Sequence, residues 1–317
     1  MAIVVIGTGI QVPKRKVKNE DLPASLQTSD EWIRSHTGIG SRYLAGEDET
    51  TTSLGAASSR KALAAAGITA DQLDLIIFTS ITPSYACIPS ESCLLQAELG
   101  AEKAMCFDIL AACSGFVYAA DTAAGLLERR GWKYALVCST EILSRIVDWT
   151  DRATCVLFGD GSGSAVLENT AATGADYGNR GLGIMYHNAD GKGARALYLE
   201  HGGRLQMDGQ AVYNFAVAEI TGIISSLMKA ENLTENDVDW IVCHQANSRI
   251  LTAAAKRLSL PVSKFVFNME EYGNTSSASI PMTLALMEEN GTLKKGMRII
   301  IAGFGAGLTG GGGIIIW

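Results

Sequence analysis

The stretch Asp71-Gln-Leu-Asp-Leu-Ile-Ile-Phe (71–78) resembles Asp237-Val-Asp-Trp-Ile-Val (237–242) later in the same chain. A second stretch, GWKYALVC (131–138), resembles GMRIIIAG (296–303). In the first pair Asp74 matches Asp239, and in the second Gly131 matches Gly296. Both matches are separated by the same number of residues, because 239 − 74 and 296 − 131 both equal 165. Short α/β units can resemble one another by chance, but two landmarks at one offset favour an internal repeat.

The same order of elements is expected in each half of the repeat. The pattern predicts a helix, a buried strand, a second helix, a short strand, a third helix and a closing strand. Apart from the second helix, we expect these at 53–66, 73–79, 104–110, 114–130 and 134–139, and again at 213–230, 238–244, 264–269, 276–290 and 297–302. Strands that are apolar throughout and alternate with helices are typical of a mainly parallel, helix-covered sheet.

Two such halves predict a layered α/β/α/β/α architecture with pseudo-twofold symmetry. The boundary is expected near residue 170, where ENTAATGADYGNRG has loop composition, so the halves cover 1–170 and 171–317.

Composition narrows the class of protein. The 317 residues are 47% hydrophobic and carry a formal net charge of −7, which argues against a nucleic-acid binder. The seven cysteines are odd in number and form no CxxC pair, so we expect reduced, buried thiols in a cytosolic protein and no metal site. No secretory signal is visible. The uncharged stretch 299–317 is interpreted as two strands around a glycine loop rather than as a membrane helix.

Three polar residues are expected to meet at one edge of the sheets. Cys113 lies in AACSGF (111–116) and Asn274 in YGNTSS (272–277), each between a predicted short strand and a helix. We interpret them as occupying equivalent helix N-termini. His244 ends a predicted strand, and ligands of open α/β sheets bind outside the carboxyl ends of strands.

The chemistry of these residues fits acyl transfer. A helix N-terminus presents unpaired N–H groups and a partial positive charge, which favour a thiolate and can bind an oxyanion. A histidine beside an amide can donate two hydrogen bonds to a second oxyanion. Taken singly, a cysteine or histidine is usually a core residue and an asparagine before a helix is usually a cap. The three together favour a covalent mechanism on Cys113.

Several sequence motifs, taken together, resemble those of a known enzyme family. AACSGF, HQAN (244–247) and GNTSSASIP (273–281), with TSDEWI (28–33), GDGSGSAVL (159–167) and GFGAG (303–307), are similar to β-ketoacyl-acyl carrier protein synthase III. That family initiates bacterial type II fatty acid synthesis and has a duplicated thiolase-like fold. The likeness covers nearly the whole chain.

The resemblance implies a reaction and a role for each residue. Cys113 would take an acyl group, typically acetyl, from acyl-CoA, and His244 and Asn274 would stabilise the enolate formed as malonyl-acyl carrier protein loses CO2. The backbone N–H groups of Cys113 and Ala306 would form an oxyanion hole, and Phe304 would pack beside the thiol and gate decarboxylation. The resemblance also implies a homodimer and no metal or nucleotide cofactor.

Contacts to the two substrates follow from the same resemblance. Trp32, Arg152 and Asn247 match positions that bind CoA. Arg249, Lys256 and Arg257 share one face of the helix after HQAN, and this face would suit an acidic carrier protein. Without the resemblance, the same face would be an ordinary solvated surface.

The chain departs from the family pattern at four positions. His36 and Asn214 stand where basic residues are common, which puts the 3′-phosphate contact in doubt and weakens the basic patch. Ala306 replaces a glycine, so its Cβ could crowd the site, and Gly310 replaces a tryptophan. The segment Cys87-Ile88-Pro89 occupies the region that, in the family, crosses the dimer interface.

Three other functions share part of this pattern. A related condensing enzyme with a longer or branched primer, or one serving secondary metabolism, would keep the same triad. A papain-like hydrolase has the order Cys, His, Asn but needs a different signature and fold, and an intact triad argues against a non-catalytic scaffold. The glycine runs at 159–164 and 303–307 match neither phosphate-binding pattern and are interpreted as turns.

Overall fold

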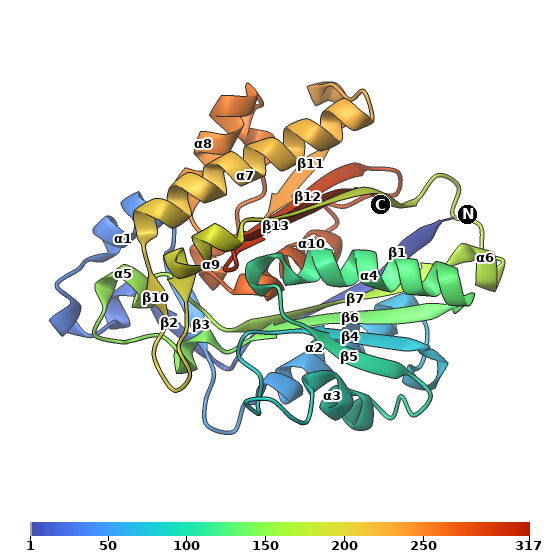
Figure 1. Cartoon of the computed structure of the whole chain (residues 1–317), viewed down its shortest axis with the longest axis horizontal. Coiled ribbons are helices and arrows are strands. Elements are labelled where there is room, and N and C mark those ends of the chain that lie inside the picture. The colour runs from blue at the N-terminus through green and yellow to red at the C-terminus, as the bar shows by residue number, and fades with distance from the viewer. Residues whose placement is uncertain (1) are drawn as a thin grey trace.

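The computed structural model describes residues 2–317, and its strands form two main sheets (Figure 1). The first sheet, in the order β1-β7-β6-β4-β5, contains β1 (Ile3–Gln11), β4 (Leu75–Thr79), β5 (Met105–Ile109), β6 (Tyr134–Glu141) and β7 (Gly161–Asn169). The second, in the order β11-β12-β13-β8, contains β8 (Gly181–Ala189), β11 (Trp240–Cys243), β12 (Arg298–Gly305) and β13 (Thr309–Ile316). Two small ribbons pair β2 (Arg15–Lys18) with β3 (Ser41–Leu44), and β9 (Leu197–Tyr198) with β10 (Gln206–Met207).

Helices form three layers around the two sheets. Helices α4 (Gly115–Arg130) and α10 (Ser279–Glu289) lie between the sheets and contact both of them. Helices α2 (Thr51–Ala66) and α3 (Glu91–Leu99) cover the outer face of the first sheet, and α7 (Gly209–Ala230) covers the second with α8 (Ser248–Leu258) beside it. The expected α/β/α/β/α fold is therefore confirmed.

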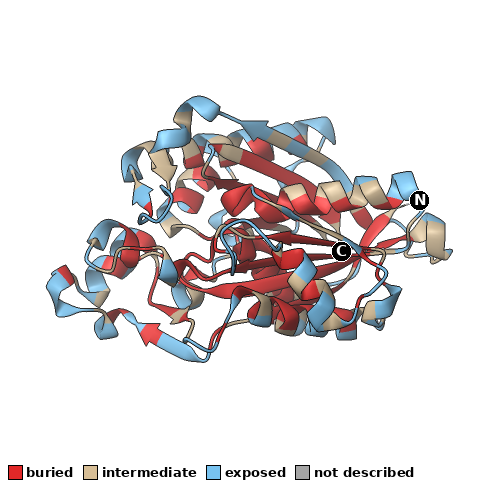
Figure 2. Ribbon diagram, turned by 60° about the horizontal axis from the view of Figure 1, so that its bottom comes forward, coloured by how far each residue is buried: buried red, intermediate tan, exposed pale blue. Residues whose placement is uncertain are grey.

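The remaining helices are short: α1 (Asp30–Thr37), α5 (Arg152–Cys155), α6 (Thr170–Thr173) and α9 (Met269–Tyr272). Local sequence sets the ends of the longer ones. The Thr50 hydroxyl accepts the Ser53 N–H at the start of α2, and Gly67 ends this helix with a left-handed conformation. The buried residues gather in the sheets and in the central helices (Figure 2).

The expectation of mainly parallel sheets was wrong. Only β4–β5, β4–β6 and β11–β12 pair in parallel, whereas β1–β7, β6–β7, β12–β13 and β13–β8 are antiparallel. In each half the closing strand turns back into an antiparallel neighbour, β6 into β7 and β12 into β13. An apolar strand buried on both faces looks the same in either direction, so the apolar run did not distinguish them.

The predicted strand at 264–269 was also wrong. Only a single bridge forms there, between Phe265 and Ile241. The Gln245 side chain takes the hydrogen bonds that a further strand would use, because its amide donates to Val266 O and accepts the Asn268 N–H. The backbone of residues 266 and 268 is thus bonded to a side chain instead of to a neighbouring strand.

The C-terminal stretch forms two strands, as expected, but its glycines are placed differently. Gly310 to Gly313 lie inside β13 rather than in the connecting loop. At Gly312 a Cβ atom would approach Ile301 O to 2.5 Å, so the close packing between strand and neighbour requires glycine.

Helix α7 is long and apolar enough to cross a membrane by length and composition alone. Its residues Ile220, Ile223 and Ile224 are fully buried, and the helix packs on β12 and β13. This packing is typical of a core helix covering a sheet.

The cysteines are all free, as expected, but not all are buried. Cys87 and Cys93 are exposed and Cys106 is half-buried. Cys93 lies on the outer helix α3, and Cys87 lies in the loop before it. The apolar residues around them in the sequence did not reveal that these two positions face solvent.

Candidate active site

Cys113, His244 and Asn274 line one cavity with a volume of about 250 Å³. They come from three distant segments, before α4, after β11 and before α10. Other lining residues include Thr37, Leu157, Phe158, Leu197, Met207, Phe215, Ile250, Phe304, Gly305 and Leu308. The structure therefore brings the three sequence-predicted residues together in one largely apolar chamber.

Cys113 lies at the start of the central helix α4. It belongs to the 3₁₀ turn Ala112–Ser114, which runs directly into the helix, and Ala112 has a φ of +43°. The Cys113 Sγ lies 3.3 Å from Ser276 Oγ, and the side chain is 6% exposed. Burial raises the pKa of Cys113 to about 12. The helix end favours the thiolate, as the sequence suggested, but burial opposes it, so the resting group is a thiol.

Asn274 is not the residue equivalent to Cys113, which corrects the sequence interpretation. The turns Ala112–Ser114 and Ser276–Ala278, and the helices that follow them, begin at a common offset of 164, since 276 − 112 and 279 − 115 agree. That offset places Ser277 opposite Cys113, and Asn274 three residues earlier. Asn274 is instead held by β-type pairing beside Phe158, through its N–H to Leu157 O and its carbonyl to Gly159 N, both at 2.9 Å.

His244 follows β11 and is 1% exposed. Its Nδ1 lies 2.8 Å from Ser279 Oγ, and that hydroxyl already accepts the Gln245 N–H. A hydroxyl has one proton and two lone pairs, so the Ser279 hydroxyl can donate to Nδ1, and in that arrangement the ring proton lies on Nε2. Burial lowers the pKa of His244 to about 3, so the ring is neutral near pH 7, and its Nε2–H tautomer can donate a hydrogen bond. Phe304 meets the imidazole edge-on, with ring centroids 5.0 Å apart.

The end of β12 passes against the backbone of Cys113. A Cβ atom at Gly305 would lie 2.6 Å from Cys113 N, so only glycine permits this approach. Ala306 is half-buried, does not line the cavity and has no positive φ, so its methyl group neither crowds the site nor strains the chain. Thr309 Oγ1 donates to Ala306 O at 3.1 Å and holds this turn.

The entrance to the cavity is aromatic and cationic. Trp32 is 37% exposed, the guanidinium of Arg152 lies 5.0 Å from its ring centroid, and His36 stacks on it at 4.3 Å. The His36 Nδ1 contacts Trp32 O at 2.8 Å. Asn247 donates to His36 O and accepts the Arg249 N–H, which ties α8 to this entrance. A planar base could stack on such a surface.

The predicted basic face of α8 is present. Arg249, Lys256 and Arg257 are exposed, and Ile250, Leu251 and Ala254 on the opposite side are buried. Asn214 lies exposed on α7.

Gly310 pairs with Phe304 across β12 and β13, outside the cavity lining. A Cβ atom here would approach the Glu219 carboxylate to 2.1 Å. The Glu219 side chain therefore fills the space that a larger residue at this position would need.

Sequence reasoning did not assign roles to two serines that contact the triad. Ser276 contacts Cys113 and Ser279 contacts His244, yet from the sequence both were interpreted only as part of the GNTSSASIP motif. The run of serine and alanine residues predicted the start of a helix and nothing about these contacts.

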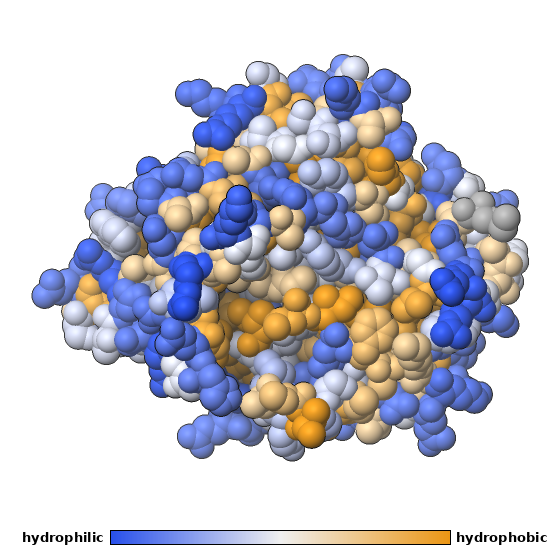
Figure 3. All heavy atoms as spheres, viewed as in Figure 1, coloured by the Kyte–Doolittle hydropathy of each residue, from blue (hydrophilic) through white to orange (hydrophobic). Residues whose placement is uncertain are grey.

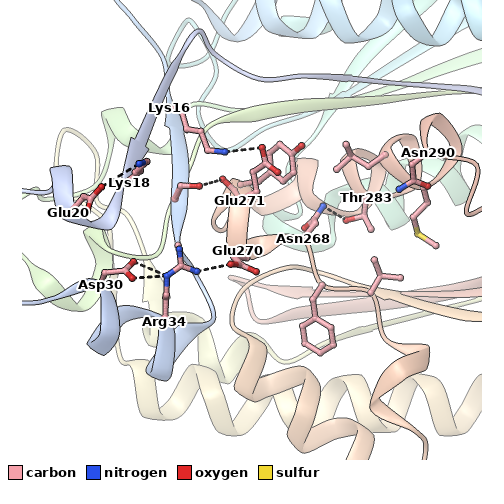
Figure 4. A pocket seen from close by; sticks show the side chains of 17 residues that line it. Lys16, Lys18, Glu20, Asp30, Arg34, Asn268, Glu270, Glu271, Thr283 and Asn290 are labelled. Atoms are coloured by element: carbon pink, nitrogen blue, oxygen red, sulfur yellow. Dashed lines mark hydrogen bonds and ion pairs between the residues drawn. The ribbon is translucent and has the colours of Figure 1, made fainter.

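A larger groove, of about 700 Å³, lies apart from the triad, between the β2–β3 ribbon and α9 and α10 (Figure 4). Its charges are paired with one another: Lys16 with Glu271 at 3.0 Å, and Arg34 with Glu270 at 2.7 Å. Among the described residues no cysteine or histidine lines this groove, so its size does not make it the site of the triad chemistry.

Comparisons with known proteins agree with this geometry. The model of the family described as 3-oxoacyl-[acyl-carrier-protein (ACP)] synthase III matches residues 107–184, and that of its C-terminal region matches residues 228–317. The chain is 42% identical to the β-ketoacyl-[acyl-carrier-protein] synthase III of Rhizobium johnstonii, covering 99% of both chains.

Solved structures show the same fold. A 3-oxoacyl-[acyl-carrier-protein] synthase III from Aquifex aeolicus matches with a TM-score of 0.94 at 37% identity, covering 99% of this chain and 100% of that chain. The priming β-ketosynthase of a polyketide biosynthetic pathway matches with a TM-score of 0.91 at 34% identity, covering 99% and 96%. With these likenesses along its whole length, the chain belongs to the β-ketoacyl-acyl carrier protein synthase III family.

Proposed function

We propose that the protein condenses an acyl-CoA primer, acetyl-CoA, with malonyl-acyl carrier protein, giving 3-oxoacyl-acyl carrier protein, CoA and CO2. This reaction initiates type II fatty acid synthesis. The observation that carries the proposal is the single cavity into which Cys113, His244 and Asn274 all project, with Trp32 and Arg152 at its entrance.

In the first half-reaction the Cys113 sulfur attacks the thioester carbonyl of the primer. The thiol proton leaves with the CoA sulfur, and the acyl group stays on Cys113. The backbone N–H groups of Cys113 and Ala306 stabilise the oxyanion of this step, and the N–H groups at the start of α4 favour its charge.

In the second half-reaction the malonyl thioester loses CO2. His244 Nε2–H and the Asn274 amide donate to the thioester oxygen and stabilise the enolate. The Asn274 Oδ1 already accepts the Ser276 N–H at 2.9 Å, which leaves the amide NH2 group for the substrate. The enolate carbon attacks the acyl-Cys113 carbonyl, and collapse of the adduct breaks the bond between that carbon and Sγ. This frees 3-oxoacyl-acyl carrier protein and leaves a Cys113 thiolate, which takes a proton from solvent to restore the thiol. Phe304, packed on His244, shields this step from water.

The entrance residues serve the two substrates in turn. Trp32, Arg152 and Asn247 bind CoA, with the adenine on the Trp32 ring. Arg249, Lys256 and Arg257 attract the acidic carrier protein. The residues suffice for this chemistry without a metal or organic cofactor, and we place the enzyme in the cytoplasm, with no nucleic-acid or membrane partner.

A homodimer fits the exposed edge of the first sheet. Strand β5 is an edge strand, and Tyr85, Ile88, Met105 and Leu110 expose large apolar side chains near it. On the face drawn in Figure 3, hydrophobic side chains gather across the middle, beside α4. A second copy would cover such an edge. The halves 1–170 and 171–317 form the two lobes of each subunit. If the protein is a homodimer, sedimentation equilibrium should give twice the chain mass of 33.5 kDa.

The test is a panel of acyl-CoAs offered with malonyl-acyl carrier protein. Acetyl-CoA should acetylate Cys113, which raises the mass of the peptide that contains this residue by about 42 Da. Acetyl-CoA should also give the highest kcat/KM of the panel. Labelling by only longer or branched primers would support the alternative, an enzyme with another primer or one serving secondary metabolism, as the likeness to a polyketide priming enzyme allows. Absence of any acyl-Cys113 would overturn the proposal.

The protonation state of His244 predicts a flat pH profile. Because burial holds its pKa at about 3, well below the ordinary 6.5, the imidazole stays neutral from pH 5 to 8. Release of CO2 from malonyl-acyl carrier protein by a Cys113→Ala enzyme should therefore vary less than about twofold across that range. A rate that falls about tenfold between pH 7 and 5.5, with a midpoint near 6.5, would contradict the neutral role.

A further inference from the structure

Glu141 is a buried carboxylate to which the proposed reaction gives no step. It ends β6 and is 0% exposed. Its Oε2 accepts from the Ile81 N–H and the Thr82 hydroxyl at 3.0 Å each, and from the Ser80 hydroxyl at 3.2 Å. Its Oε1 lies 2.7 Å from the Ser277 hydroxyl. The carboxylate therefore joins the segment after β4 to the segment before α10.

The hydroxyl groups around Glu141 are oriented to donate. Thr82 Oγ1 already accepts the Ile142 N–H at 2.8 Å, and Ser80 Oγ accepts the Thr82 N–H at 3.0 Å. Their protons are thus free for the carboxylate. Burial raises the pKa of Glu141, and these donors oppose the rise by stabilising the ionised form. They also hold the side chain in place.

The segment that Glu141 holds, residues 276–279, contacts every member of the triad. The contacts are Ser276 Oγ to Cys113 Sγ at 3.3 Å, Ser276 N–H to Asn274 Oδ1 at 2.9 Å, and Ser279 Oγ to His244 Nδ1 at 2.8 Å. Within residues 2–317, Glu141 is the only acidic side chain hydrogen-bonded to this segment. A shift of the segment would move all three groups relative to one another.

We propose that Glu141 is a positioning residue, which through Ser277 fixes segment 276–279 and so sets the mutual geometry of Cys113, His244 and Asn274. The inference rests on the proposed function and deepens it. Glu141 lies outside the cavity lining, so it does not touch the substrate; besides its contact with Ser277, its charge adds to the raised pKa of Cys113.

The test compares Glu141→Ala with Glu141→Gln. The alanine enzyme loses the contact to Ser277, and kcat per acylatable Cys113 should fall about 10- to 100-fold, the range expected for ångström-scale misplacement. The KM for acetyl-CoA should stay within about threefold, because Trp32 and Arg152 are untouched. The glutamine can accept from the segment after β4 and donate to Ser277 Oγ, so kcat should return to within about fivefold of wild type.

Glu168→Ala is the matched control. Glu168 is also buried, at 4% exposure, and accepts from the Tyr177 hydroxyl, but it lies on β7 outside the cavity lining and has no contact with segment 276–279. This variant should lose thermal stability and keep the wild-type kcat per acylatable site. A Glu141→Ala enzyme with wild-type kcat per site, or a Glu141→Gln enzyme as slow as the alanine one, would overturn the inference.

Ser277→Ala serves if Glu141→Ala does not fold, since it removes the same contact from the other side. Its kcat should fall about tenfold at constant KM, and an unchanged kcat would count against positioning. Alkylation of Cys113 by iodoacetamide separates this inference from the proposed function. It should be at least about threefold faster in Ser277→Ala than in wild type, because that variant loosens segment 276–279 around the thiol and keeps the Glu141 charge. That readout needs no substrate, whereas failure of the wild-type enzyme to condense would overturn the proposed function alone.

Discussion

Replacing Cys113 with serine is expected to lower the condensation rate by at least about a thousandfold. Serine keeps nearly the same shape at the start of α4, but its hydroxyl is a far weaker nucleophile than a thiol and leaves poorly from the adduct. In the Nε2–H tautomer neither ring nitrogen of His244 is free to remove the serine proton, because Nδ1 then accepts from Ser279. The measurement is transfer of labelled acetyl from acetyl-CoA to malonyl-acyl carrier protein.

The same Cys113→Ser enzyme should still release CO2 from malonyl-acyl carrier protein, because His244 and Asn274 remain. Cys138→Ser is the control, as Cys138 is likewise a buried cysteine but lies outside the cavity. Its sulfur already faces Thr140 Oγ1 at 3.5 Å, so a hydroxyl there finds a partner. A Cys113→Ser enzyme that condenses at the wild-type rate would rule out the covalent intermediate.

Gly305→Ala is expected to reduce kcat by about a hundredfold, although alanine adds one methyl group. The added Cβ would lie 2.6 Å from Cys113 N, 3.1 Å from Cys113 Cβ and 3.2 Å from its Cα. These are backbone and near-backbone atoms, so they cannot swing aside as a flexible side chain would. Either β12 or the start of α4 must shift, which separates Cys113 from His244 and Asn274. Overpacking of this kind also costs about 1–3 kcal/mol of stability.

The measurements are steady-state kinetics and thermal unfolding of Gly305→Ala, with Gly125→Ala as the control variant. Gly125 lies on the exposed face of α4, and a Cβ there meets nothing within 4 Å. This second variant should keep full activity and gain up to about 1 kcal/mol from better helix propensity. Full activity in Gly305→Ala would show that the chain can relax around the methyl group. That result would contradict the expectation that the close approach of β12 to Cys113 requires glycine.

The sequence predicted which residues meet, because periodicity and the repeat locate strand ends and helix starts. Cys113 and His244 both lie where those patterns placed them. Asn274 was matched to the wrong partner, since a repeat shows that two helices are equivalent but not which residue of one faces which residue of the other. That register depends on the turn before each helix, where Ala112 and Ser276 adopt positive φ values of 43° and 49°.

Other features needed the packed structure. The thiol state of Cys113 and the neutral state of His244 come from burial, which no local pattern measures. The lost strand at 264–269 depended on Gln245, a residue interpreted only as part of HQAN. The role of Gly305 appears only when β12 is seen against the backbone of Cys113.

The offset of 164 between the two helix starts has a consequence for how the repeated halves divide their work. A repeat offers two corresponding places for a nucleophile, one at the head of each inner helix. This chain has Cys113 at the first and Ser277 at the second, where the serine hydroxyl is turned to Glu141. On the proposed mechanism one copy is reactive and the other supports it. An enzyme built from two like halves would then carry a single active centre, with the second position lending it rigidity.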